Sequence, residues 1–521
     1  MAAGTSRRDG RVAKTGGLRI GATSTHSIED VLALARGALR AELDDDPGYR
    51  ERLAASRVAL ERAHAAGGEI YGVTTGVGAS IDISIPTQHR DELALNLVRF
   101  HGCGTGRILD ETEAAAVVAV RLISLARGLS GVRAALVERL CDLLNERVLP
   151  RIPEEGSVGA SGDLTPLSYL AAAVAGEREV TFAGSVLPAS DALARVGLPR
   201  FALAPKESLA LMNGTAVMTA IACVAWERAA RLARLAAAIT ASVVDSTRGN
   251  PEHFDARIFA AKPHPGQSRC AAWIRDDLGL GEGRGPTYTP ARLQDRYSLR
   301  CAPHVIGVLV DALEESRRIL EVEINGVDDN PLVDPDTGDV LHGGNFYGGH
   351  VGFAMDSLKA AVASVADLLD RQLALLCVPD TSDGLPANLV DAENVSHHGF
   401  KALQISASAL TAEAQKLTMP ASAFSRSTES HNQDKVSMGT IAARDCRRVV
   451  ELSETVAAIV LLAACQALDL REGGSGLRRP IALRDAVRKS VPRLTRDRRQ
   501  DLDIERVLAM LRDDALPLGP R

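Results

Sequence analysis

The sequence predicts a mainly α-helical fold built around a bundle of long helices. The chain has 521 residues, of which 46% are hydrophobic and only 3% aromatic. Alanine and leucine abound, and both favour helices. Residues 216–244 and 440–472 each run for about 30 residues without a single glycine or proline, well beyond the mean helix of about 11–12 residues. Long apolar helices are stable when they pack against one another, so we expect a bundle.

Four regions follow one another along the chain. Residues 1–17 contain Arg7, Arg8, Arg11 and Lys14 but no apolar run, so we expect a disordered N-terminal tail and no secretory signal. Residues 18–200 form a mixed region with glycine-rich loops. Residues 201–471 form the helix bundle, with expected helices at 216–244, 305–324, 349–377 and 440–472. Residues 472–521 form a charged C-terminal region. Because no Pro/Ser linker divides them, we expect these regions to intertwine as one unit.

Composition and charge argue against several classes of protein. The net charge of −6 gives no reason to expect nucleic acid or an anionic membrane as a partner. The most apolar stretch, residues 456–465, is about half the ~20 residues that a membrane helix needs. The eight cysteines show no zinc-binding spacing, and His397 and His398 lack i,i+4 spacing, so we expect no metal. Scattered cysteines are typical of reduced thiols in a cytoplasmic protein.

The stretch GSVGASGDLTP, residues 156–166, concentrates the least bulky residues of the region. Gly162 has no Cβ, so its backbone nitrogen can approach the carbonyl carbon of Ala160. Loss of water would close a five-membered ring, and elimination of the Ser161 hydroxyl would leave an electrophilic methylene. We expect Asp163 to assist proton transfers, and Asp163 or Thr165 to cap the helix that follows. The alternative is an ordinary Gly/Ser loop before a helix.

Eight motifs in one order decide between these interpretations. They lie within a stretch from about Tyr71 to Asp445 and comprise YGVTTGVG, GSVGASGDLTPLSYLA, NGT, PHPGQ, QDRYSLRCAPHVIG, DNPL, GGNF and HNQDKVSMG. Together they resemble the signatures of the histidine, phenylalanine and tyrosine ammonia-lyases and the related aminomutases. The resemblance implies the mainly α ammonia-lyase (fumarase/aspartase-like) fold and a carbon–nitrogen lyase. It also implies a methylidene-imidazolone group (MIO) formed from Ala160, Ser161 and Gly162, and a homotetramer whose active sites use loops from three subunits.

The resemblance also assigns roles to residues. Tyr71 corresponds to the essential tyrosine that takes a proton from the β-carbon, and it needs positive or hydrogen-bonding surroundings to do so near neutrality. Arg300 would hold the substrate carboxylate with a two-pronged grip. Asn213 would donate to the ring carbonyl. Further family site positions are Gln294, Tyr297, Asn345, Phe346, Lys401, Glu429 and Asn432.

Two positions bear on the substrate. Histidine ammonia-lyases carry glutamate where this sequence has Gln433, whereas the phenylalanine and tyrosine enzymes carry glutamine. The pair Phe100 and His101 is a hybrid: Phe100 suits a plain phenyl ring, and His101 could hydrogen-bond a phenol or merely pack behind the pocket. We therefore expect phenylalanine as substrate, then tyrosine, then histidine, with cinnamate or coumarate as product.

Two other functions remain open. An aromatic amino acid 2,3-aminomutase, which returns the amine to the β-carbon, would use the same residues. The other is a helical scaffold that keeps the fold but has no catalytic activity. Such a protein would lack one or more of Tyr71, Ser161, Asn213 and Arg300, and all four are present.

Overall fold

The computed structural model describes residues 16–282, 288–391, 396–471 and 477–519. Their contacts divide the chain into two compact units. The first comprises the chain up to Cys223 with Leu320–Val351 and Phe424–Ile441, and the second comprises Val224–Ile319, Gly352–Ala423 and Ala442–Arg521. Each unit draws on separate stretches of the chain; the expected regions, their boundary near residue 200 and their intertwining as one unit stay predictions. Residues 1–15 of the expected tail lie outside the described residues, and Gly16 already begins a strand.

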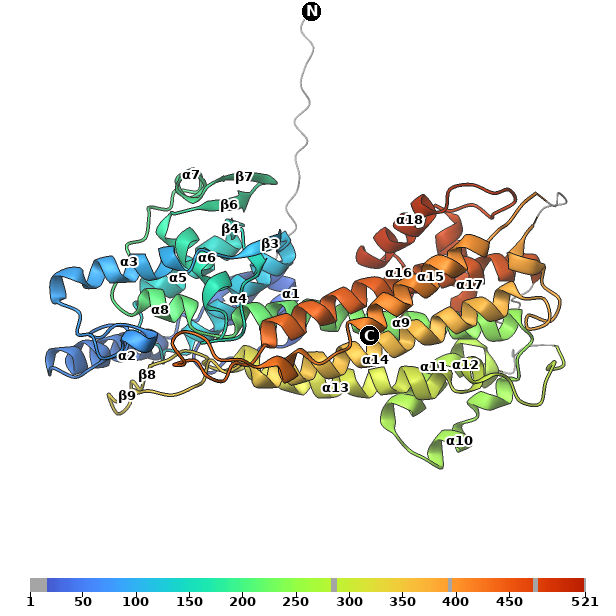
Figure 1. Cartoon of the computed structure of the whole chain (residues 1–521), viewed down its shortest axis with the longest axis horizontal. Helices are drawn as coiled ribbons and strands as arrows, with labels where there is room; N and C mark the ends of the chain where they lie inside the picture. Colours follow the sequence, from blue (N-terminus) through green and yellow to red (C-terminus); the bar gives the residue numbers. More distant parts are fainter. Residues whose placement is uncertain (1–15, 283–287, 392–395, 472–476, 520–521) are drawn as a thin grey trace, which may run out of the picture. The chain divides into compact units, whose positions relative to one another are not determined.

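The first unit is a layer of helices edged by short strands (Figure 1). Its helices are α1 (Ile28–Ala35), α2 (Pro47–Ala65), α3 (Arg90–Phe100), α4 (Glu111–Ala126), α5 (Ala134–Asn145), α6 (Leu164–Ala175), α7 (Ala189–Arg195) and α8 (Glu207–Met212). Strands β1 (Gly16–Ile20) and β2 (Leu39–Leu43) pair in parallel. The other strands pair antiparallel: β3 (Thr105–Ile108) with β5 (Pro153–Glu155), β4 (Leu149–Pro150) with β6 (Glu179–Phe182), β6 with β7 (Ser185–Pro188), and β8 (Leu332–Val333) with β9 (Val340–Leu341).

Helix α4 forms the centre of the first unit. Asp110 caps its N-terminus in a reciprocal capping box with Glu113, which satisfies two backbone N–H groups. Every residue from Glu113 to Ala126 is buried, as expected of a helix that is apolar on all sides. Helices α1 and α5 pack against it.

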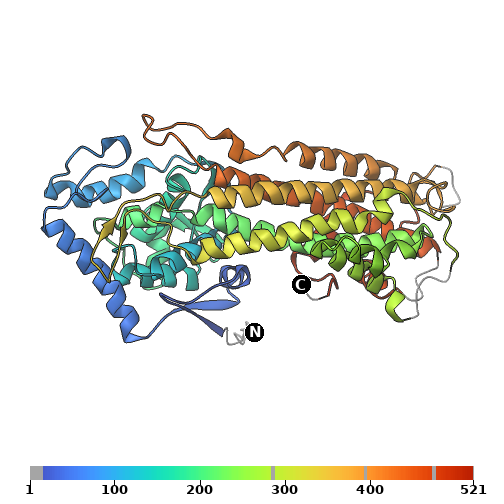
Figure 2. The same ribbon diagram turned by 90° about the horizontal axis from the view of Figure 1, so that it is seen from below.

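The second unit contains most of the long helices. These are α9 (Ala216–Ser246), α13 (Ala302–Asn325), α14 (Gly349–Cys377) and α16 (Gly439–Arg471), each of which begins or ends in the first unit. Figures 1 and 2 show their parts within the second unit lying side by side, with α15 (Lys401–Lys416) alongside. The shorter helices here are α10 (Ala256–Ala260), α11 (Pro265–Asp277), α12 (Tyr297–Arg300), α17 (Arg478–Arg488) and α18 (Asp501–Arg512). The predicted mainly α fold with long helices is confirmed.

Polar side chains fasten α9 to its three neighbours within the second unit. The Trp226 indole N–H donates to the Leu313 carbonyl of α13, 2.8 Å away. The Arg228 guanidinium binds the Glu454 carboxylate of α16 in a two-pronged ion pair. The Gln372 amide of α14 donates to the Thr240 hydroxyl at 2.9 Å. Because buried polar groups need partners, these bonds help to fix the register of the helices.

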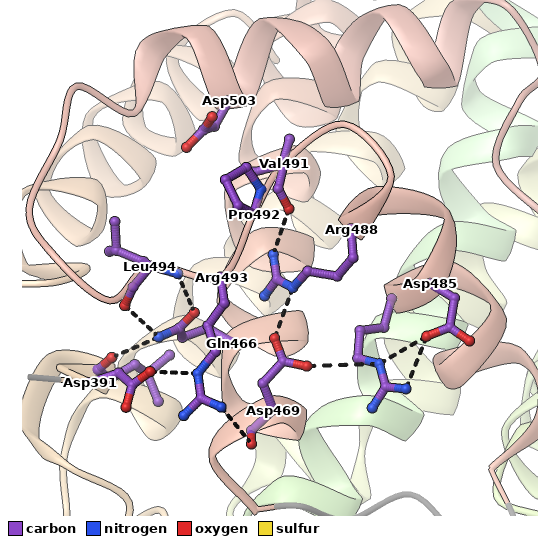
Figure 3. A network of polar contacts seen from close by, with 12 residues as sticks. Asp391, Gln466, Asp469, Asp485, Arg488, Val491, Pro492, Arg493, Leu494 and Asp503 are labelled. Atoms are coloured by element: carbon purple, nitrogen blue, oxygen red, sulfur yellow. Dashed lines mark hydrogen bonds and ion pairs between the residues drawn. The ribbon is translucent and has the colours of Figure 1, made fainter.

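The charged C-terminal region packs on the end of α16 (Figure 3). Arg488 of α17 donates to Asp469 of α16 at 2.8 Å. Gln466 of α16 exchanges two hydrogen bonds of 3.0 Å with the backbone of Leu494. Arg493 and Asp391 form an ion pair. The basic residues of this region therefore serve, at least in part, as internal ion-pair partners.

One described helix, α16, is long and apolar enough to cross a membrane by length and composition. The structure buries 89% of its apolar window inside the protein, which is the environment of a core helix.

Candidate active site

The Ala160–Ser161–Gly162 loop lies between β5 and α6 and is shaped by close packing. Ser161 has φ +47°, and the flanking Gly159 and Gly162 have φ +78° and +76°, a region that side chains disfavour. A Cβ at Gly162 would overlap the Gly214 carbonyl, and a Cβ at Gly159 would overlap the Ser437 hydroxyl. Glycine is therefore required at these two positions by the Gly214 carbonyl and the Ser437 hydroxyl that pack against them.

The backbone of Gly214 pairs with this loop. The Gly214 N–H donates to the Ser161 carbonyl oxygen at 3.2 Å, and the Asp163 N–H donates to the Gly214 carbonyl at 2.7 Å. The Ser161 carbonyl is the one that would become the ring carbonyl of the MIO group that the resemblance implies. We expected Asn213 to be its donor, but the Asn213 amide donates to the Asn330 carbonyl at 2.9 Å. In the structure the Gly214 N–H is the donor to this carbonyl, and the role of Asn213, which lines the cavity beside Ser161, stays a prediction.

Asp163 is fully buried beside the loop; the capping role expected for it is wrong, and its role in proton transfer stays a prediction. Its side chain does not cap α6. It accepts hydrogen bonds from the Val217 and Met218 N–H groups at the start of α9, and from the hydroxyls of Ser157 and Thr440. Burial raises the pKa of Asp163 to about 6 against the lowering effect of these bonds. Asp163 thus ties the loop to α9 and titrates close to neutrality.

These residues fit the group that the resemblance implies. The glycine at 162 leaves room that a Cβ would fill, Ser161 already has an unusual positive φ, and a backbone N–H points at the future ring carbonyl. Strained backbone of this kind is concentrated at functional sites.

A cavity of about 420 Å³ opens beside Ser161, within the first unit. Helices α3, α6 and α8, which contact one another, supply part of its wall. It is lined by Tyr71, Gly76, Val77, Gly78, Ser80, Ile83, Ile85, Leu93, Leu97, Phe100, His101, Ser161, Leu164, Leu209, Asn213, Glu429 and Gln433. A mostly apolar cavity with a few polar groups is typical of a small-molecule site.

Tyr71 lies in this wall with its hydroxyl hydrogen-bonded. The Gly78 N–H donates to the Tyr71 oxygen at 2.8 Å. Burial raises the pKa of Tyr71; the Gly78 bond lowers it, and the Glu429 carboxylate raises it again. The hydrogen-bonding partner that we expected is present, but the net effect of the surroundings disfavours the phenolate.

Phe100 and His101 end α3 at the cavity. Their rings lie 4.0 Å apart. His101 Nδ1 is 2.9 Å from the Leu97 carbonyl, and this bond requires the proton on Nδ1. Burial lowers the pKa of His101, so the ring is neutral and its Nε2 is a hydrogen-bond acceptor.

Glu429 and Gln433 belong to a strained turn. Glu429, Ser430 and His431 have φ of +51°, +53° and +64° in succession, which non-glycine residues rarely adopt. The Glu429 carboxylate accepts the Ala79 N–H at 2.8 Å, which links this turn to the tyrosine loop. The Gln433 oxygen accepts the Thr428 hydroxyl at 3.1 Å.

The other predicted site residues do not line this cavity. Ala160 and Gly162 flank Ser161. In the first unit, Asn345 donates to the Val327 carbonyl, Phe346 is half-buried and Asn432 is exposed. In the second unit lie Gln294, Tyr297, Arg300 and Lys401; the Arg300 guanidinium lies 4.7 Å from the Tyr297 ring. Their roles stay predictions.

Apolar cavity residues were missed by sequence reasoning. Leu97 precedes Phe100 and His101 by three and four positions on α3, so helical spacing alone could have placed it on the same face. Leu164 and Leu209 carried no comparable signal. Among the described residues, no group of three or more His, Cys, Asp or Glu side chains could hold a metal ion.

Comparison with known proteins yields consistent relatives. The family model for aromatic amino acid lyases matches residues 26–489. The histidine ammonia-lyase of Caldanaerobacter subterraneus subsp. tengcongensis is 38% identical over 489 residues, covering 93% of this chain and 95% of that protein. The histidine ammonia-lyase of Anaeromyxobacter dehalogenans is 40% identical over 503 residues, covering 95% and 98%. The crystal structure of a tyrosine aminomutase from Streptomyces globisporus superposes with a TM-score of 0.89 at 35% identity, covering 96% of this chain and 98% of that one.

Proposed function

From the premise that the chain belongs to the aromatic amino acid lyase family and is a carbon–nitrogen lyase, we propose that it is a histidine ammonia-lyase. It would convert L-histidine to urocanate and ammonia. The observation that carries this proposal is the 38–40% identity to histidine ammonia-lyases over more than nine-tenths of both chains.

The prediction of a phenylalanine or tyrosine ammonia-lyase is wrong. It gave decisive weight to Gln433 and Phe100, whereas the similarity to histidine ammonia-lyases extends along the whole chain. Physical chemistry also allows histidine here. A glutamine amide can both donate to and accept from an imidazole, and Glu429 supplies a carboxylate to the cavity wall.

Several predicted site residues have a role in this proposal. Tyr71 removes a proton from the substrate β-carbon and must first lose its own phenolic proton. His101 Nε2 accepts the substrate's imidazole N–H and so orients the ring. The apolar side chains around them exclude water from the reacting atoms. Arg300, the predicted carboxylate-binding residue, would hold the other end of the substrate.

The Ala160–Ser161–Gly162 loop would hold the prosthetic group. When formed, MIO supplies an electrophilic methylene carbon, derived from the Ser161 side chain, for the substrate amino group. The Gly214 N–H donates to the Ser161 carbonyl and would draw electron density toward that oxygen.

The active form would be a homotetramer in the cytoplasm, binding neither nucleic acid nor membrane. Exposed apolar side chains support assembly: Val308 on α13, Phe353 on α14 and Ile405 on α15 are 60%, 66% and 71% exposed. Such side chains are typical of interfaces between subunits. All eight cysteines are free, as in a reducing compartment.

A 2,3-aminomutase is a second candidate, favoured by the close likeness to the S. globisporus tyrosine aminomutase fold. Such an enzyme would return the amine to the β-carbon and release a β-amino acid. The residues discussed above do not distinguish the two reactions.

Separate incubations with L-histidine, L-phenylalanine and L-tyrosine test the proposal. We expect urocanate from L-histidine, with far lower kcat/KM for the other two substrates, measured by chromatography of both unsaturated acids and β-amino acids. A β-amino acid as the main product would support the second candidate. Inactivity toward L-histidine would contradict the proposal.

A further inference from the structure

Gly214 lies between the Ala160–Ser161–Gly162 loop and a buried ion pair. On one side, its N–H and carbonyl bond to the backbone of Ser161 and Asp163, and Gly162 and Gly214 form a parallel β-bridge. On the other side, a Cβ at Gly214 would overlap the Arg121 guanidinium and crowd the Asp328 carboxylate. The position of Gly214 therefore determines where the loop backbone can lie.

Asp328 fixes the position of Gly214 through hydrogen bonds to the neighbouring residue, Thr215. Its carboxylate accepts the Thr215 N–H at 2.6 Å, the Thr215 hydroxyl at 3.0 Å and the Ser124 hydroxyl at 2.7 Å. Arg121 of α4 donates to the same carboxylate at 2.7 Å. Through these four hydrogen bonds the Asp328 carboxylate connects α4, the centre of the first unit, to Thr215, the residue that follows Gly214.

The Arg121–Asp328 ion pair leaves two buried nitrogen atoms of Arg121 unsatisfied within the described part of the chain. Arg121 is fully buried, yet its Nε and Nη2 have no hydrogen-bond partner among the described residues. A buried pair with unsatisfied donors stabilises a fold little, because desolvation offsets the attraction. Burial alone would raise the pKa of Asp328, but Arg121 and the hydroxyl and N–H donors hold it below its ordinary value, so the carboxylate is charged.

We propose that Asp328, held by Arg121, is a positioning residue for cyclisation of the Ala160–Ser161–Gly162 loop. The inference rests on the proposed function, since it concerns formation of the same electrophile. In the cyclisation, the Gly162 nitrogen bonds to the Ala160 carbonyl carbon. The Ala160 oxygen leaves as water with the amide protons of Gly162 and Ser161, and a double bond forms between the Ala160 carbon and the Ser161 nitrogen. The Ser161 hydroxyl then leaves with the Ser161 Cα proton as a second water, so no oxidant or reductant is needed. Asp328 acts through Gly214, whose two hydrogen bonds hold the loop backbone in a compressed turn.

The test is the intact mass of the soluble, helical fraction of Asp328→Asn. This change keeps the shape of the side chain but removes its charge. We expect most of these chains to retain both waters, whereas wild-type chains have lost them. Asp277→Asn is the matched control, because Asp277 is a buried aspartate bonded to a buried arginine, Arg234, in the second unit. This variant should be destabilised as well but fully dehydrated.

A milder variant covers the case in which Asp328→Asn yields no soluble protein. Thr215→Val removes the hydroxyl bonds to Asp328 and Glu323 and keeps the side-chain volume. Its dehydration, followed by mass after cell-free synthesis, should be several-fold slower than in wild type. The inference would be overturned by any of three results. These are an unchanged dehydration rate in Thr215→Val, full dehydration of Asp328→Asn, or loss of dehydration in Asp277→Asn. A wild-type chain at full mass would instead contradict the proposed function.

Discussion

At the residue scale, the surroundings of Tyr71 determine how the proposed base can work. The Tyr71 side chain is half-buried, and its hydroxyl accepts one backbone N–H and lies near the Glu429 carboxylate. Burial and Glu429 raise the pKa of Tyr71, and only the Gly78 N–H lowers it. Most Tyr71 side chains are therefore protonated at neutral pH, and the reactive phenolate is a minority form.

We therefore expect kcat for L-histidine to rise with pH from the neutral into the alkaline range. Raising the pH removes the phenolic proton, and only the phenolate can take the proton from the β-carbon. Tyr71→Phe should lower kcat by about 10²–10⁴-fold, the usual contribution of a general base, and remove this rise. Urocanate formation followed at a series of pH values measures both effects. A pH-independent wild-type kcat would argue against Tyr71 as the base.

His101 provides a second test at this scale. Because its Nδ1–H is used by the Leu97 carbonyl, its Nε2 can only accept. His101→Leu removes this acceptor and leaves the substrate N–H without a partner, which costs about 1–3 kcal/mol. KM for L-histidine should rise by about 10-fold or more, while helix content stays constant. An unchanged KM would show that His101 packs behind the site without touching the substrate.

At the scale of elements, Arg178 holds the end of α3. Its guanidinium donates to the Val98 carbonyl at 2.8 Å and to the Ser168 hydroxyl at 3.1 Å, and it lies over the Tyr169 ring. Cations at a helix C-terminus satisfy carbonyls that have no partner within the helix. Arg178 thus sets the position of Phe100 and His101 without being part of the cavity wall.

Arg178→Met should therefore raise KM for L-histidine about fivefold, which corresponds to about 1 kcal/mol of lost helix-end stabilisation. The effect on kcat should be smaller, and Arg178→Lys should restore part of the affinity. Arg139→Met is the control, since Arg139 also donates to a backbone carbonyl and lies over an aromatic ring. Equal changes in both methionine variants would mean that the effect is not specific to α3.

Asp245 on α9 gives the element-scale test of stability. Burial, opposed by Arg471, raises the pKa of Asp245 from 3.8 to about 6. A carboxyl group whose pKa is higher in the folded than in the unfolded state stabilises the folded protein at pH below its unfolded-state pKa. This contribution is lost as the pH rises through the folded-state pKa. Asp245→Asn should therefore stabilise the protein by about 3 kcal/mol at neutral pH and leave its stability unchanged in strong acid.

The free energies of unfolding of wild type and Asp245→Asn, measured with denaturant at neutral pH and in strong acid, give this difference. Asp380→Asn, which changes an exposed aspartate of the same unit, should have little effect at either pH. A destabilising effect of Asp245→Asn at neutral pH would show that the carboxylate is more strongly stabilised than its burial suggests.

The long helices were predictable because their signal is local. The stretch at 349–377 matches α14 (Gly349–Cys377), and the stretch at 440–472 matches α16 (Gly439–Arg471) within one residue at each end. The contacts of the loop were not predictable in the same way. Asp163 accepts hydrogen bonds from the start of α9 and does not cap α6. Asp328 accepts a hydrogen bond from Thr215, although the two residues are more than a hundred positions apart in the sequence. Such long-range contacts depend on tertiary packing, which no local pattern records.

At the scale of the whole molecule, the predicted site residues divide between the two units. Tyr71, Ser161 and Asn213 belong to the first, and Arg300 and Lys401 to the second. The resemblance implies active sites built from three subunits, so residues of different subunits would combine in each site.

Complementation between inactive chains tests this arrangement. Ser161→Ala and Arg300→Ala should each be inactive as homotetramers. Co-expressed, they should form mixed tetramers in which some sites combine an intact Ser161 from one chain with an intact Arg300 from another. Urocanate production by the mixed species, purified with two different tags, should clearly exceed that of either parent. Mixed tetramers as inactive as their parents would place both residues of each site on one chain.

The most direct measurement of the central claim is the intact mass of the purified wild-type chain. Formation of the electrophile from Ala160, Ser161 and Gly162 predicts a polypeptide lighter than its sequence mass by two water molecules. Ser161→Ala, which cannot undergo the second elimination, should not show this loss and should not produce urocanate. A wild-type chain of unmodified mass that converts L-histidine to urocanate would contradict the account.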